Sequence, residues 1–128
     1  MSPNSAASAY REEVLETAPP IKIVRLLSQG ALSFLERALA CNAGDPASEF
    51  VALVSRADAV VYELRLSLDS DRAPEIAVPL KQLYLFVEDQ LQQAVRDRDP
   101  APVVAARKVL ATLYEAWSKV SVSGGSAA

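Results

Sequence analysis

The clearest structural signal in the sequence is EIAVPLKQLYLFVEDQLQQAV, residues 75–95. Apolar residues recur in it at the i, i+3, i+4 and i+7 spacing of one helix face. The predicted inward positions are Ile76, Leu80, Leu83, Val87, Leu91 and Ala94. Within the same helix, however, the run LYLFV (83–87) is apolar at every position. At about 100° per residue, such a run surrounds the helix, whereas a helix at the surface of a bundle needs only one apolar face.

Three further segments show the same helical spacing. They run from about residue 20 to 42, from 45 to 68 and from 99 to 120, while the first signal spans about 74–98. Asp45 and Asp99 are predicted N-caps, because each stands directly before a proline that suits the first helical position. Four helices of about 20 residues with short connections predict an all-α protein, an antiparallel up-down four-helix bundle.

Core positions are also predicted for the other three helices, and Pro79 is expected to kink or shift the start of the helix that contains it. The predicted core residues are Val24, Leu27, Ala31, Phe34, Leu35, Ala38, Phe50, Leu53, Val54, Ala57, Val60, Val61, Leu64, Leu68, Val103, Ala106, Leu110, Leu113, Trp117 and Val120.

The chain divides into three predicted parts. Residues 1–17 form an N-terminal arm, partly mobile, that is expected to be a short helix or a lid over an apolar groove. Residues 18–120 form the bundle. Residues 121–128, rich in Ser, Gly and Ala, are expected to be a disordered tail.

Composition excludes several functional classes. The net charge of −3 and the pI of about 4.9 argue against binding to nucleic acid. The chain has no histidine, which removes Ser-His and Cys-His catalysis and His-ligated metals, and no glycine-rich phosphate loop. We therefore expect no enzyme, no cofactor and no metal site. No apolar run reaches membrane-spanning length, and the start lacks a signal-peptide pattern. The single cysteine, Cys41, allows no internal disulfide, which fits a reducing cytoplasm, the expected location.

A second apolar stripe follows the helix predicted for residues 45–68. Its members lie roughly 120–200° from the centre of the core face, and no charge interrupts it. These members are Val51, Ser55, Ala59, Tyr62 and Leu66. On the next helix Val78 and Leu85 lie nearly opposite the core face, and Phe86 lies about a quarter turn from it. The stripes are interpreted as a groove for a partner segment, against the alternatives of ordinary exposed hydrophobic residues or cover by another part of the chain.

The order of motifs resembles the flagellin-specific export chaperones of the FliS type. Tyr10 precedes VLETAPP, which is followed by LLSQGALSFLERA, YELRLSLD, EIAVPLKQLYLFVEDQL and LYEAWSKV. The resemblance covers about residues 10–120. Two departures stand out, because Ser28 and Gln29 replace a common Tyr-Asp pair and Pro19 replaces a common Ser.

The resemblance implies a cytoplasmic chaperone that binds the C-terminal segment of flagellin one to one. Such a chaperone holds flagellin unassembled and delivers it to the flagellar type III export apparatus, where it also contacts the export gate. Tyr10 is the residue onto which the docking role would carry, and it is also a candidate anchor or lid. The eight residues of the two stripes are assigned to flagellin from helical geometry alone.

Two alternatives remain open from the sequence. The stripes also suit a self-associating bundle that forms a homodimer without cargo, and the chain also suits an adaptor that binds a regulator.

Overall fold

The computed structural model describes residues 20–68, 71 and 73–127, and for residues 20 and 120–127 only the backbone. It contains four helices, α2 (Pro20–Leu39), α3 (Phe50–Leu66), α4 (Pro74–Asp97) and α5 (Ala101–Ala127). The described ranges contain no strand, which confirms the all-α prediction. The predicted N-terminal arm, with Tyr10, lies outside the described residues.

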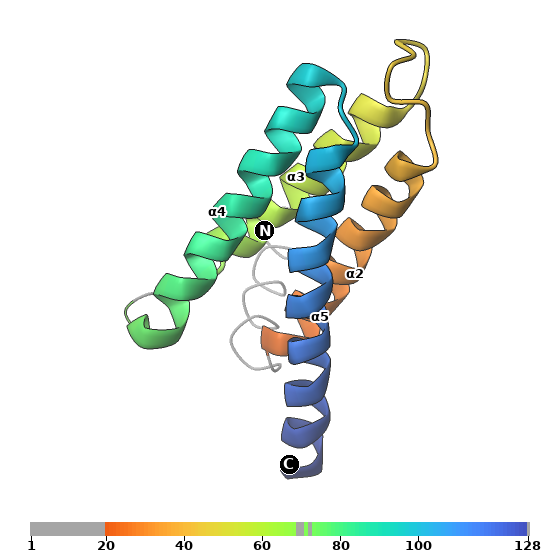
Figure 1. Ribbon diagram of the computed structural model, residues 1–128. Coiled ribbons are helices and arrows are strands. Elements are labelled where there is room, and N and C mark those ends of the chain that lie inside the picture. Colours follow the sequence, from red (N-terminus) through yellow and green to blue (C-terminus); the bar gives the residue numbers. More distant parts are fainter. Residues whose placement is uncertain (1–19, 69–70, 72, 128) are drawn as a thin grey trace, which may run out of the picture.

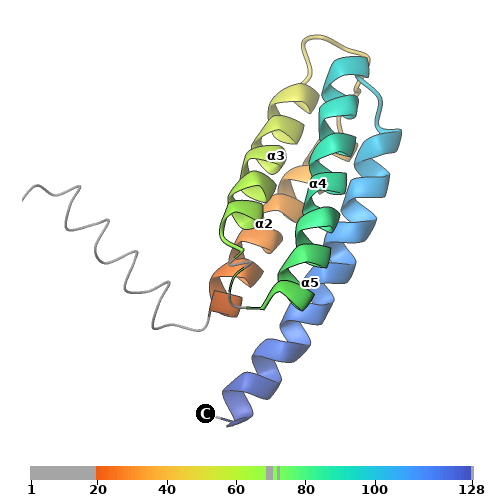
Figure 2. The same ribbon diagram turned by 90° about the vertical axis from the view of Figure 1, so that its left-hand side faces the viewer.

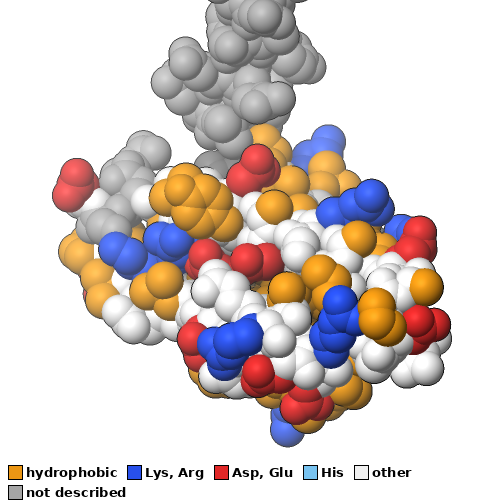
Figure 3. Space-filling view, turned by 90° about the horizontal axis from the view of Figure 1, so that it is seen from above, with side chains coloured by type: hydrophobic (Ala, Val, Ile, Leu, Met, Phe, Trp, Pro, Cys, Tyr) orange, Lys and Arg blue, Asp and Glu red, His pale blue; other side chains and the backbone are white. Residues whose placement is uncertain are grey.

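The helices form a closed ring. Each helix packs against the next along the chain, and α5 returns to pack against α2. Neighbouring helices run in opposite directions, and α5 extends beyond the others at the end marked C (Figures 1 and 2). This arrangement is the predicted up-down bundle. At the opposite end, which carries the α2–α3 and α4–α5 connections, hydrophobic side chains are scattered among acidic and basic ones (Figure 3).

The ends of α4 and the start of α5 lie at the proline and capping residues predicted from the sequence. Pro74 stands at the start of α4, and Arg98 ends that helix in the left-handed conformation (φ 49°) with its N–H bonded to the Ala94 carbonyl. The Asp99 carboxylate then accepts a hydrogen bond from the Ala101 N–H (3.0 Å), as expected of a capping residue. The helix α4 continues without interruption through Pro79.

The predicted start of α3 is wrong. The helix begins at Phe50 rather than after Asp45. The Asp45 carboxylate accepts the Ala47 N–H (2.9 Å) and its carbonyl accepts the Ser48 N–H (3.0 Å), so Asp45 closes a turn before the helix. At the other end of the bundle, α5 continues to Ala127, through the segment expected to be a disordered tail.

The interior is filled by aliphatic side chains from all four helices, together with Phe50 and Tyr84. The members with almost no exposed surface include Leu35, Leu53, Val54, Val61, Leu64, Val87, Leu91, Val103 and Leu110. Val24, Leu27, Phe34, Val60, Leu68, Leu80 and Trp117 were predicted inward and are partly buried against this cluster. Most of the predicted core is therefore confirmed, apart from two positions in α4. The side chain of Val120, also predicted inward, lies outside the described part of the structure.

Those two positions are Ile76 and Leu83, which are 57% and 40% exposed. Tyr84, predicted at the edge, is only 1% exposed. Glu88, whose carboxylate pairs with Arg65 of α3, is also buried. Compared with the prediction, the buried side of α4 is therefore rotated about the helix axis toward α3. Ile76 lies in the first turn of α4, at one end of the bundle.

Replacing a leucine of this interior tests the packing. We expect Leu91→Ala to lower the free energy of unfolding by about 2–5 kcal/mol, since Leu91 has no exposed surface and its removal leaves a cavity. Leu26→Ala, at a site that is 56% exposed, should change it by less than about 0.5 kcal/mol. Urea unfolding followed by circular dichroism measures both, and equal losses would contradict this assignment of the core.

Candidate functional site

Large hydrophobic side chains outside the core gather on α4. Nine are exposed among the described residues, and five of them belong to this helix. The five are Ile76, Val78, Leu83, Leu85 and Phe86. Single exposed hydrophobic residues are normal on a protein surface, but a concentration on one helix is typical of a surface that a partner covers.

Most residues of the predicted groove are at the surface. Tyr62, Leu66, Val78, Leu85 and Phe86 are exposed large hydrophobic residues. The small members of the α3 stripe, Ser55 and Ala59, are exposed as well. Val51 is half-buried and packs against the core, so of the eight it is the least available to a partner. Their assignment to a bound segment stays a prediction.

The exposed residues of α4 divide between two sides of the helix. Glu88 marks the side toward α3, because its carboxylate bonds Arg65, and Val78 and Leu85 lie within about 80° of Glu88. Leu83 marks the side toward α5, because it lines a cavity with residues of that helix, and Phe86 lies about 60° from Leu83. We call the first surface, with Tyr62, Leu66, Val78 and Leu85, the α3/α4 face.

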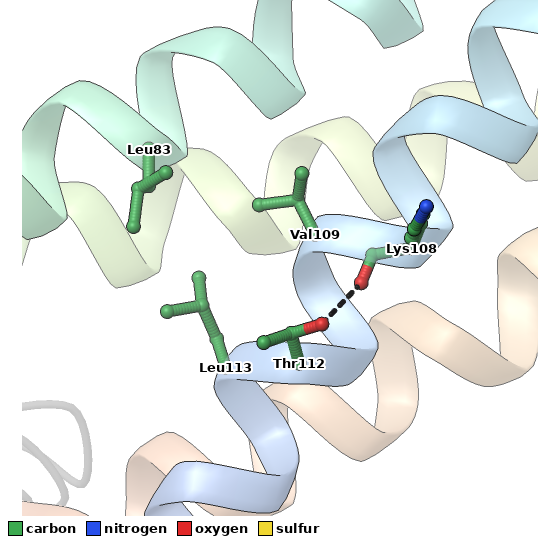
Figure 4. Close-up of a pocket in the computed structure, with 5 residues that line it drawn as sticks. All are labelled: Leu83, Lys108, Val109, Thr112 and Leu113. Carbon is green, nitrogen blue, oxygen red and sulfur yellow. Dashed lines mark hydrogen bonds between the residues drawn. The ribbon is translucent and has the colours of Figure 1, made fainter.

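The second surface contains a cavity of about 250 Å³ between α4 and α5. Leu83 reaches into it from α4, and Lys108, Val109, Thr112 and Leu113 line it from α5 (Figure 4). The Thr112 hydroxyl donates a hydrogen bond to the Lys108 carbonyl (3.0 Å) within its own helix, so little polar surface faces the cavity. Since a cavity of roughly 150 Å³ holds a benzene molecule, this one has room for an aliphatic or aromatic side chain.

Sequence reasoning missed this cavity. Leu83 and Leu113 were assigned to the core, and the three other lining residues were assigned to no site. A signal was present, because Val109 and Leu113 form an apolar i, i+4 pair at the edge of the core stripe of α5. Finding the cavity, however, requires knowing which side of α4 faces α5.

A polar cluster lies beside the α3/α4 face. The Arg65 guanidinium donates hydrogen bonds to both oxygens of the Glu88 carboxylate, from Nε at 2.6 Å and from Nη2 at 3.3 Å. The Tyr62 ring centroid lies 5.2 Å from the same guanidinium. One turn earlier on α3, the Asp58 carboxylate has a buried oxygen, Oδ1, without a hydrogen-bond partner.

The Asp58 carboxyl is in an unfavourable place for a negative charge. Burial raises its pKa above the ordinary value, and the charge of Glu88 raises it further. A hydrogen bond from Gln92 and the charge of Arg65 act in the opposite direction and are smaller. Ionised Asp58 therefore weakens the folded state.

Comparison with known proteins gives the family. A family model described as "Flagellar protein FliS" matches residues 2–124. The chain belongs to the FliS family. This result confirms the resemblance found in the motifs.

Relatives in several bacteria carry the name of a chaperone. The chain is 30% identical over 111 residues to the flagellar secretion chaperone FliS of Salmonella typhimurium, covering 86% of this chain and 82% of the relative. It is 28% identical over 120 residues to FliS of Campylobacter jejuni, covering 94% of each. It is 27% identical over 110 residues to FliSB of Pseudomonas aeruginosa, covering 86% and 87%.

Membership of the FliS family confirms that the chain is a chaperone of flagellum biogenesis and not an enzyme. None of the helices in the described part of the chain combines the length and the apolar character that crossing a membrane requires. Within the same residues, no group of three His, Cys, Asp or Glu side chains is placed to hold a metal ion.

The structure describes both residues, Ser28 and Gln29, that replace the common Tyr-Asp pair of the FliS motif. Ser28 has no exposed surface, and its hydroxyl has no hydrogen-bond partner among the described residues. Gln29, next to it, is exposed. Of the two replaced positions, only Gln29 is available to a partner.

Neutralising Asp58 should stabilise the protein. Because the folded-state pKa lies above the ordinary value of 3.8, the ionised form costs stability at neutral pH, and this cost disappears as the pH falls below that value. We expect Asp58→Asn to raise the thermal unfolding midpoint at neutral pH, with a gain that shrinks on acidification. Asp89→Asn, at an exposed site on α4, is the matched control and should change little. A lower midpoint for Asp58→Asn at neutral pH would contradict the prediction.

Proposed function

We propose that this FliS-family protein is a cytoplasmic export chaperone that binds the C-terminal segment of flagellin one to one. It keeps that segment from polymerising and brings it to the flagellar type III export apparatus. The observation that carries the proposal is the concentration of exposed hydrophobic residues on both sides of α4, with a cavity on one of them. The names of the relatives, flagellar secretion chaperones, support the same reading.

Two apolar surfaces suit a segment that wraps the bundle. The α3/α4 face and the α4/α5 cavity lie on different sides of one helix, so a single straight partner helix in one groove covers only one of them. A disordered segment that folds on binding covers both by crossing α4. Flagellin held in this way is kept in a form that cannot assemble, because its own segment is committed to the chaperone.

The energies are compatible with this mode of binding. Ordering a disordered segment costs about 2–5 kcal/mol or more. Burial of one leucine-sized side chain contributes about 1.5–3 kcal/mol. The ordering cost is offset if the segment buries Tyr62, Leu66 and Leu85 and places one of its own side chains in the α4/α5 cavity.

Delivery to the export gate is assigned to the N-terminal arm. Tyr10 is the proposed docking residue, or a lid over the groove when cargo is absent. Both roles rest on the resemblance and on an aromatic residue in an arm otherwise rich in small ones.

The main competitor is self-association through the same faces. A homodimer of the free protein would also cover the α3/α4 face, and an adaptor for a regulator would use it as well. Light scattering across a range of concentrations separates the first case, since a cargo chaperone with free faces keeps the mass of one chain.

Two charges on the α3/α4 face should abolish binding. We expect Tyr62→Asp together with Leu66→Asp to remove detectable binding of a peptide covering the flagellin C-terminal segment, because both sites are exposed and carboxylates cannot be buried there without a partner. Calorimetric titration measures the affinity, and circular dichroism verifies that the fold is intact.

The matched control places the same charges at isolated exposed sites. Leu26→Asp with Ser33→Asp introduces two charges at exposed sites of α2, whose neighbours in the ring are α3 and α5, and should retain most of the affinity. Equal losses in both double variants would argue against a specific face. Loss of helicity in the first would mean that Tyr62 and Leu66 belong to the core.

Filling the cavity tests the second surface. Val109→Phe places a ring in the space between Leu83 and Leu113, so a cargo side chain no longer enters. We expect binding of the same peptide to weaken about tenfold or more, the value of one buried aliphatic anchor, while the unfolding midpoint stays the same or rises. Unchanged affinity would show that the cargo does not use the cavity.

A further inference from the structure

Tyr62 combines exposure with a fixed neighbour. Its ring is 48% exposed on α3, and it belongs to the α3/α4 face. An exposed tyrosine on a helix ordinarily samples several rotamers, and a partner that binds it must then order the ring. Here the Arg65 guanidinium lies 5.2 Å from the ring centroid, within the range of cation–π attraction.

The guanidinium is itself held from a different helix. Both oxygens of the Glu88 carboxylate accept hydrogen bonds from it, at 2.6 and 3.3 Å. The Arg65 and Glu88 side chains are only 19% and 7% exposed, unlike those of a solvated surface ion pair. Two-point contact with a carboxylate fixes the plane of the guanidinium as well as its position. The ring of Tyr62 therefore lies next to a cation that cannot swing away.

The neighbouring charges keep the cation in place. Asp58 lies on the same side of α3 and attracts the guanidinium, as does Glu88 from α4. The hydrogen bond to Glu88 raises the pKa of Arg65, and the charges of Glu88 and, more weakly, Asp58 act in the same direction. An arginine side chain is in any case a cation at every physiological pH. Lysine at this site would keep the charge and lose both the two-point contact and the planar face.

We propose that Arg65 is a positioning residue, which the Glu88 carboxylate holds in place so that Tyr62 is a preordered aromatic platform on the α3/α4 face. The platform takes an apolar side chain of the flagellin segment, and that use rests on the proposed function. The ordering of the ring is a property of the free protein. A ring that is already ordered does not lose that freedom on binding, and this improves affinity without adding a contact.

The first test examines the free protein. Tyrosine carrying carbon-13 in its ring reports, by nuclear magnetic resonance, the order of Tyr62 and its proximity to the Arg65 side chain. We expect an ordered ring in the wild type and a mobile one in Arg65→Lys. Buried Tyr84, 1% exposed, is the internal control and should stay ordered in both.

A second variant keeps the test decisive if the first disturbs the fold. Arg65→Met with Glu88→Met removes both charges together, so no unpaired charge is left between α3 and α4 and we expect the bundle to be retained. The Tyr62 ring should be as mobile in it as in Arg65→Lys. A ring equally ordered, or equally mobile, in the wild type and in both variants overturns the proposal.

The last test connects the platform to cargo. In a double-mutant cycle with the flagellin peptide, we expect Tyr62→Ala to cost about three- to tenfold more affinity in the wild type than in the Arg65→Met, Glu88→Met background. Ring ordering without peptide binding would support the positioning role and reject the proposed function. Peptide binding with no coupling between Tyr62 and the ion pair would reject the positioning role and leave the chaperone proposal standing.

Discussion

A helix in a closed ring of four can bury only the part of its circumference that faces its two neighbours and the centre. Helix α4 has apolar residues well beyond that part. The interior takes Tyr84, Val87 and Leu91, and the remaining apolar side chains must lie at its two outer edges. The α3/α4 face and the α4/α5 cavity are consequences of that limit, because α4 has more apolar residues than the interior can hold.

The two sides of α4 differ in chemistry. The side of α4 toward α3 contains a partly buried ion pair beside exposed hydrophobic residues, whereas the side toward α5 contains an open apolar cavity. A charged pair of this kind gives little net stability, because both groups lose water, but it fixes which side chains face each other. The side of α4 toward α3 therefore combines a defined arrangement of side chains with exposed apolar area.

Much of the fold could be predicted from the spacing of apolar residues and from the residues that begin and end helices. Prolines and capping aspartates set the limits of α4 and α5, and exposed positions such as Tyr62 and Leu85 followed from the 100° rule. The same rule placed Leu83 inside and Tyr84 at the edge, which the structure reverses, because periodicity does not say on which side the neighbouring helix lies. Asp45 misled the prediction because an aspartate before a proline closes a turn as readily as it caps a helix. The Arg65–Glu88 pair and the cavity join residues of different helices, which no single-helix pattern reveals.

The ring is closed by the first and last described helices. Glu36 of α2 and Arg107 of α5, 71 residues apart, form an ion pair at 3.0 Å across that junction. During synthesis α5 leaves the ribosome after the three helices that it completes, so the apolar faces of α2, α3 and α4 stay uncovered until α5 has emerged. The ring therefore closes only after all four helices have been made, and until then the nascent chain presents exposed apolar helices of the kind that chaperones themselves recognise.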